Sequence, residues 1–157
     1  LGAVGPVARA TGAPVYCPEL EQQVLANVMD YVPYPGFGPF ESYDADVLVA
    51  GGEHLQLAGL KIDVVFTPGH SPGHVTYAAR QTGDAEDVAP MLFSGDVLFQ
   101  QSVGRTDLPG GDHQVLLQSI ATLMERFPDD SVVHPGHMGL TTLGRERATN
   151  PFLTSLA

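Results

Sequence analysis

Residues 66 to 74 read Phe66-Thr67-Pro68-Gly69-His70-Ser71-Pro72-Gly73-His74, a turn rich in Gly and Pro that follows the apolar run Ile62–Phe66. A run of this kind is typical of a strand, and Gly69 allows the backbone a sharp turn before the histidine. The same order of features recurs at Leu92-Phe93-Ser94-Gly95-Asp96 and at Val132-Val133-His134-Pro135-Gly136-His137. In each case we expect a rigid strand to present a metal-binding side chain at its end.

These three strand ends predict one shared metal site formed by His70, Asp96 and His137. Imidazole and carboxylate are the ligands expected for zinc or iron rather than for magnesium or calcium. Taken singly, each feature has a structural explanation, because a histidine in a turn can serve as a loop hydrogen-bonding group and Ser-Gly-Asp can form a turn or a helix cap. Three of them in one small chain favour a common site.

The middle of the chain is predicted to consist of short strands, because apolar and β-branched runs are bounded there by Gly pairs and charges. A long helix is predicted from about His113 to Phe127, with Asp112 as its N-cap and an apolar stripe along one side. A last turn of helix over Arg145–Asn150 is expected to stop at Pro151. The predicted strands are residues 47–49, 55–57, 62–66, 74–79, 91–93 and 131–133.

The N-terminal part of the chain is predicted to mix helix, strand and loop. Apolar residues at 1, 4, 7 and 8 match helical spacing, residues 15–17 form a short strand candidate, and residues 18–21 are typical of a helix start. Residues 31–43 hold three Pro and two Gly and are predicted to be a loop. The order of elements predicts a layered α/β fold without regular βα alternation, in a single domain over residues 1–157.

The composition excludes several classes of protein. With 157 residues, 43% of them hydrophobic, the chain is long enough for a real core and is unlike a disordered segment. Seven Lys and Arg stand against 18 Asp and Glu, a net charge of −11 without any basic cluster, so no nucleic-acid partner is expected. No apolar run approaches the roughly 18 residues of a membrane span, so no membrane association is expected. The single cysteine, Cys17, fits a reducing compartment, and a cytoplasmic location is predicted.

Several motifs resemble, in order and spacing, the later motifs of the metallo-β-lactamase superfamily. They are Thr67–His74, Phe93–Asp96, Gly104–Asp107 with Gly110–Asp112, and Pro135–His137. Within that superfamily the chain resembles the short, single-domain glyoxalase II-like hydrolases, whose last residues are similar to Thr141–Arg147 followed by Asn150–Leu153. The resemblance covers essentially the whole chain and implies an αββα sandwich with a metal centre at one edge of its two sheets.

The first metal motif of that family, His-x-His-x-Asp-His, does not occur in this sequence. In the family it comes immediately before a segment like Leu1–Val4, so the resemblance predicts an N-terminally incomplete domain without its first strands and half of its metal ligands. We therefore expect this 157-residue chain to hydrolyse thioesters poorly or not at all. We also expect open sheet edges to favour association, although the oligomeric state is left open.

Within this resemblance, each site residue takes the role of its family counterpart. His70 resembles the ligand that completes the first metal position, and His137 the ligand that completes the second. Asp96 resembles the carboxylate that bridges both metals, so it is the predicted catalytic residue that orients the nucleophile. Three residues are expected to support the site without binding metal: His74, Arg105 and Asp107. Four others are predicted to lie outside it: His54, His113, His134 and Cys17.

The resemblance implies a metal-dependent hydrolase with two zinc ions, for which iron or manganese are alternatives. A metal-bound hydroxide would attack the carbonyl carbon of an ester-like bond, and one metal would stabilise the oxyanion. The implied substrate is a small-molecule thioester of the S-2-hydroxyacylglutathione kind. Two other interpretations stay open: a mononuclear iron persulfide dioxygenase on the same fold, and an inactive fragment or non-catalytic interaction module.

Overall fold

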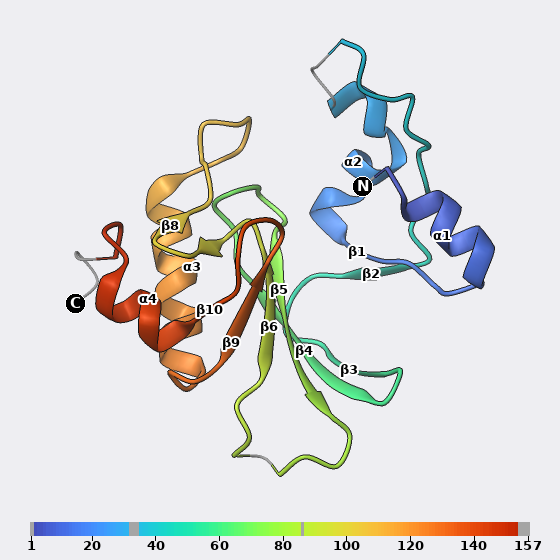
Figure 1. Ribbon diagram of the computed structural model, residues 1–157. Helices are drawn as coiled ribbons and strands as arrows, with labels where there is room; N and C mark the ends of the chain where they lie inside the picture. The colour runs from blue at the N-terminus through green and yellow to red at the C-terminus, as the bar shows by residue number, and fades with distance from the viewer. Residues whose placement is uncertain (1, 32–34, 86, 154–157) are drawn as a thin grey trace. The chain divides into compact units, whose positions relative to one another are not determined.

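The computed structural model describes residues 2–31, 35–85 and 87–153, and it divides into two compact units, residues 1–50 and 51–157 (Figure 1). The single domain over residues 1–157 stays a prediction. Among the described residues, no helix has the length and apolar character needed to cross a membrane.

Residues 51–157 contain a mixed sheet of six strands among their described residues, in the order β10-β9-β6-β5-β4-β3. Neighbouring strands run antiparallel except for β6 and β9, which are parallel. Because β6 and β9 are parallel, the residues that follow both strands lie at the same edge of the sheet. The strands are β3 (His54–Leu57), β4 (Leu60–Phe66), β5 (Val75–Gln81), β6 (Met91–Gly95), β9 (Val132–Pro135) and β10 (Thr141–Thr142).

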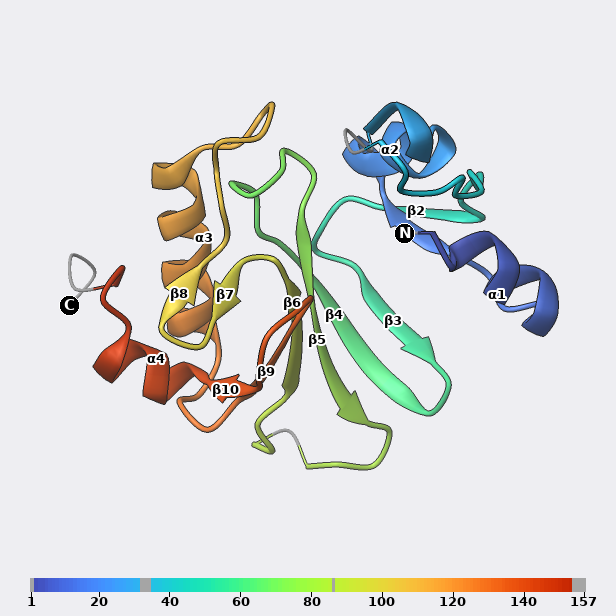
Figure 2. The same cartoon turned by 45° about the horizontal axis from the view of Figure 1, so that its top comes forward.

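Two helices, α3 (His113–Arg126) and α4 (Leu143–Thr149), lie on the same side of this sheet in both views (Figures 1 and 2). The predicted N-cap of α3 is confirmed, since the Asp112 carboxylate accepts a hydrogen bond from the backbone N–H of Val115 at 3.0 Å. Apolar residues of both helices and of the sheet form one buried core. Its members include Leu92, Val133, Leu116, Ile120, Leu123 and Leu143.

A short hairpin lies between β6 and α3 in the sequence. Its strands are β7 (Leu98–Phe99) and β8 (Ser102–Val103), and Gln101 in the turn adopts a positive φ of 56°. These strands and β10 have two residues each, too few to give a strand signal in the sequence. They were not predicted, whereas the five longer strands described in residues 51–157 lie within a few residues of the predicted ranges.

Residues 1–50 form a small unit of their own. Its parallel pair joins Tyr16 of β1 to Val47 of β2; β2 matches its predicted range, and β1 lies one residue later than predicted. Helix α1 ends at Gly12, which adopts the left-handed conformation that closes a helix. The described residues 35–46 contain no helix or strand, as predicted; residues 1 and 32–34, which belong to the predicted first helix and loop, lie outside the described part. The elements are α1 (Val4–Thr11), β1 (Tyr16–Pro18), η1 (Glu19–Glu21), α2 (Gln22–Ala26), η2 (Val28–Tyr31) and β2 (Val47–Val49).

The last helix begins earlier than predicted. Helix α4 starts at Leu143, two residues before the predicted start at Arg145. The hydroxyl of Thr142 accepts a hydrogen bond from the backbone N–H of Arg145 at 3.2 Å, so Thr142 is the N-cap. Both ends of α4 therefore have a clear cause, because Pro151 follows directly after the C-cap Asn150.

Candidate metal centre

The turn after β4 holds His70 in place through contacts with the start of α3. The backbone carbonyl of Gly69 accepts a hydrogen bond from the Asp112 N–H at 2.8 Å, and the Ser119 hydroxyl donates to the Pro68 carbonyl at 2.7 Å. Gly69 has a φ of 128°, and a Cβ there would lie 2.4 Å from the Cα of Leu116. Only glycine allows this close approach of turn and helix.

The imidazole of His70 is oriented by a backbone group. Its Nδ1 lies 2.9 Å from the carbonyl oxygen of Arg105, which can only accept, so Nδ1 carries the proton. The lone pair of the neutral ring is then on Nε2. That nitrogen lies 3.7 Å from the Oδ2 of Asp96. A backbone carbonyl that fixes the tautomer in this way is a common feature of metal-binding histidines.

Asp96 follows β6 and is held at its backbone by His74. The Nε2 of His74 accepts the Asp96 N–H at 3.3 Å, so the proton of this ring is on Nδ1, which donates to the Thr67 hydroxyl at 3.1 Å. Both ring nitrogens of His74 are therefore occupied within the chain. Neither nitrogen is then left to bind a metal, and the supporting role of His74 stays a prediction.

Two glycines pack so closely against Asp96 that neither position has room for a side chain. A Cβ on Gly136 would lie 2.4 Å from the Asp96 Oδ1, and a Cβ on Gly104 would lie 1.9 Å from its backbone oxygen. The Gly136 N–H also donates to the Gly95 carbonyl at 2.8 Å, which joins the ends of β6 and β9. The strand ends thus bring the two loops into direct contact at the carboxylate.

His137 reaches the same carboxylate from the end of β9. Its Nε2 lies 3.6 Å from the Asp96 Oδ2, and its ring stacks on Phe99 with centroids 4.4 Å apart. The side chain is 61% exposed, against 18% for His70 and 32% for Asp96. One oxygen of Asp96 therefore lies between two imidazole nitrogens, and the site is open to solvent on the His137 side.

These separations fit ligands of a common cation. Two atoms bound to one tetrahedral zinc at about 2.1 Å are about 3.4 Å apart, close to the 3.6 and 3.7 Å found here. Among the described residues, however, no three His, Cys, Asp or Glu side chains close into a single group around one point. The geometry is that of two His–Asp pairs sharing one carboxylate oxygen, and each pair needs further donors to complete a metal position. The role of these three residues as ligands stays a prediction.

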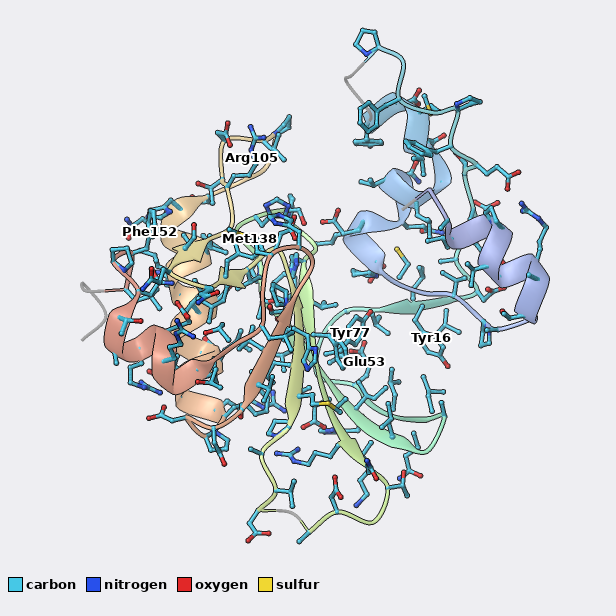
Figure 3. The ribbon with its side chains drawn as sticks, viewed as in Figure 1. Tyr16, Glu53, Tyr77, Arg105, Met138 and Phe152 are labelled. Carbon is cyan, nitrogen blue, oxygen red and sulfur yellow. The ribbon has the colours of Figure 1, made fainter. Side chains whose placement is uncertain are left out.

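The predicted bracing residues form an ion pair with each other. The guanidinium of Arg105 donates two hydrogen bonds of 2.7 Å to the carboxylate of Asp107, and both side chains are more than half exposed. The hydrogen bond from Arg105 is the main cause that lowers the pKa of Asp107 to about 2. Arg105 and Met138, both labelled in Figure 3, lie on the two loops that flank the site.

The other predicted residues lie outside the site. His134 stacks on Phe93 with centroids 5.0 Å apart, and His54 pairs with Asp63 at 2.6 Å. His113 is the exposed first residue of α3. Cys17 is buried in the other unit, where burial first and Glu21 second raise the pKa of its thiol.

Two further residues were not predicted from the sequence: Phe99, which contacts His137, and the buried Glu146. Phe99 was not singled out because its contact with His137 joins residues far apart in the chain. Glu146 is a carboxylate that is completely buried. It could have been noticed, since it lies three residues after the apolar Leu143 and four before Asn150, on one face of a short helix.

A model of the metallo-β-lactamase superfamily matches residues 1–137. The chain is 42% identical over 104 residues to the hydroxyacylglutathione hydrolase GloC of Haemophilus influenzae, which covers 66% of this chain and 46% of that protein. It is 34% identical over 162 residues to the probable metallo-hydrolase YqgX of Bacillus subtilis, which covers 100% of this chain and 72% of that protein. The chain thus spans about half the length of GloC and somewhat more of YqgX.

Solved structures show the same fold. The structure of the BLEG-1 B3 metallo-β-lactamase matches with a TM-score of 0.83 and 41% identity, over 98% of this chain and 71% of that chain. The structure of TTHA1623 in a di-iron-bound form matches with a TM-score of 0.77 and 38% identity, over 97% of this chain and 71% of that chain. The structure of ETHE1 from Myxococcus xanthus matches with a TM-score of 0.68 and 27% identity, over 95% of this chain and 55% of that chain.

Proposed function

This chain belongs to the metallo-β-lactamase superfamily and has its fold, and from that premise we propose that it is part of a glyoxalase II-like hydrolase. The proposed substrate is a small-molecule thioester of the S-2-hydroxyacylglutathione class, cleaved to a hydroxy acid and a thiol. The identity to GloC, whose name is hydroxyacylglutathione hydrolase, supports this substrate class.

The observation that carries the proposal is the pair of imidazole nitrogens, from two different strand ends, that lie near one carboxylate oxygen of a third. The Nε2 atoms of His70 and His137 lie 3.7 and 3.6 Å from the same Oδ2 of Asp96. Neutral imidazole and carboxylate suit zinc, iron and manganese, so the residues present fit the metals of the family. When bound, such ions would supply the positive charge that this acidic chain lacks and would activate water near neutral pH.

Other groups of the chain fix the orientation of His70 and Asp96. The Arg105 carbonyl keeps the proton of His70 on Nδ1, so its Nε2 lone pair faces Asp96. His74 holds the backbone of Asp96, so the carboxylate projects from a fixed position at the edge of the sheet. Preorganisation of this kind favours reaction because little reorganisation is left for the transition state.

The test is thioester hydrolysis, followed by release of the thiol, in the encoded protein that contains these 157 residues and in the 157-residue chain itself. We expect zinc-dependent turnover in the former and little or none in the latter. Asp96→Asn removes the shared negative charge and is expected to lower kcat/KM by at least about a hundredfold. Asp130→Asn, at an exposed turn, is the matched control and should leave turnover unchanged.

Two results would contradict the proposal. The first is full activity of Asp96→Asn, and the second is a preference for another substrate. A chromogenic β-lactam is assayed in parallel because of the likeness to BLEG-1. Absence of turnover with every substrate would favour the non-catalytic interpretation.

The second candidate is a mononuclear iron persulfide dioxygenase. Gly104–Asp107 resembles that branch of the superfamily, and the match to a protein solved in a di-iron-bound form supports iron as a metal. Metal analysis and oxygen uptake with glutathione persulfide distinguish the two candidates. Oxygen consumption without thioester cleavage would favour the dioxygenase.

A further inference from the structure

The two imidazoles of the site are oriented in different ways. His70 is held by a hydrogen bond from Nδ1 to the Arg105 carbonyl. No hydrogen bond to the ring of His137 is found within the described ranges, but the ring stacks on Phe99 with an interplanar angle of 26°. Phe99 is only 4% exposed, whereas the His137 side chain is 61% exposed. The buried ring is therefore the fixed partner, and the exposed imidazole lies against it.

The hairpin that carries Phe99 is anchored by a buried carboxylate on α4. Glu146 has no exposed surface, yet its carboxylate accepts hydrogen bonds from three donors. These are the Gln101 N–H at 2.7 Å, the Asn150 side-chain amide at 2.9 Å and the Thr141 hydroxyl. A buried carboxylate requires such partners. The turn of the β7–β8 hairpin is thereby tied to α4.

Asn150 ties the two strands of the hairpin to the same helix. Its side-chain amide donates to the carbonyl oxygens of Ser102 at 3.0 Å and of Phe99 at 3.4 Å, as well as to Glu146. The backbone of Phe99 is thus held directly from the last residues of the chain. Glu146 and Asn150 therefore have a structural role of their own, which is to hold the β7–β8 hairpin against α4.

We propose that Phe99 is the positioning residue of His137. The buried Glu146–Asn150 network fixes the hairpin, and the Phe99 ring sets the plane in which the His137 Nε2 faces Asp96. The inference rests on the proposed function only in taking His137 as a metal ligand. Residues that orient a ligand from behind typically change metal affinity 10–100-fold when they are replaced.

The orientation is tested without metal, by NMR of the 157-residue chain. The Phe99 ring should shift the carbon-bound protons of the His137 imidazole upfield; a His137→Gln variant identifies their signals. Phe99→Leu keeps an apolar side chain but removes the ring, so these signals should move toward the values of a free histidine. Phe99→Tyr keeps the ring and should restore the shift. Phe127→Leu, at an equally buried phenylalanine of the core (5% exposed), is the matched control for lost packing.

Zinc affinity, measured by competition with a chromophoric chelator, gives the second readout. We expect Phe99→Leu to weaken zinc binding about tenfold and Phe99→Tyr and Phe127→Leu to change it less than about twofold. Thermal unfolding without metal records how much stability each variant loses. A structural effect alone would weaken binding equally in Phe99→Leu and Phe127→Leu.

The proposal is overturned if the His137 signals do not move in Phe99→Leu, or if Phe127→Leu weakens zinc binding as much as Phe99→Leu. The NMR result decides the orientation even if the parent chain binds no zinc. Failure of the proposed function is a separate outcome: the encoded protein would then cleave no thioester, while the NMR difference between the Leu and Tyr variants would remain.

Discussion

At the scale of single residues, Arg105 has two separate roles in its backbone and its side chain. Its carbonyl oxygen accepts the hydrogen bond that fixes the tautomer of His70, while its guanidinium binds Asp107. Every variant of Arg105 other than a deletion keeps the carbonyl. A side-chain substitution therefore tests the ion pair without removing the group that orients His70.

Arg105→Met is expected to raise the pKa of Asp107 from about 2 toward its ordinary value of 3.8, because the hydrogen bond from Arg105 is the main cause of the low pKa. A lowered pKa means that this ion pair favours the folded state above about pH 4 and that the contribution is lost as the pH falls through 2. NMR titration of the Asp107 carboxyl carbon measures the change. Arg126→Met is the control, and an unchanged Asp107 pKa in Arg105→Met would contradict the assignment.

At the scale of elements, local signals were predictable and distant contacts were not. Helix α3 could be predicted from its N-cap and its apolar stripe, because both are formed by residues close together in the sequence. The strand ends that carry His70, Asp96 and His137 also have local Gly and Pro signals. The stack of Phe99 on His137 joins residues 38 positions apart, and the burial of Glu146 depends on a hairpin formed elsewhere. Such contacts depend on tertiary packing, which sequence periodicity does not encode.

Asp112→Ala is expected to destabilise the protein by about 1 kcal/mol, because the first turn of α3 loses its side-chain cap. For a chain of this length, that corresponds to a fall in Tm of about 2–4 °C. Asp112→Asn keeps a capping oxygen and should lose only a few tenths of a kcal/mol. Differential scanning calorimetry distinguishes these values. Equal losses in the two variants would show that the negative charge, rather than the cap, is what stabilises the helix.

At the scale of the whole molecule, the histidines are unevenly distributed along an acidic sequence. All six histidines lie in residues 51–157, and the net charge of the chain is −11. The residues that form the candidate centre therefore come from one of the two compact units. An anionic substrate approaching this chain would meet repulsion that depends on ionic strength.

For a glutathione thioester, which is anionic, KM is expected to fall roughly threefold as the salt concentration rises from about 10 mM to about 200 mM, provided that the encoded protein has the acidic excess of this chain. The value of kcat should change little, because screening acts on approach rather than on the chemical step. Steady-state kinetics over a salt series measures both constants. An uncharged thioester serves as the control and should show no such trend; the same trend with both substrates would contradict an electrostatic cause.

The parallel pairing of β6 with β9 also affects when, during folding, the residues of the candidate site come together. Asp96 and His137 are 41 residues apart, and they meet only after the intervening segment has folded and returned β9 to the edge of β6. Closing so long a loop is entropically costly and slow compared with forming a helix. If Asp96 and His137 bind a metal, we therefore expect binding to occur late, after the sheet has formed. Metal binding would then indicate that this part of the chain has finished folding.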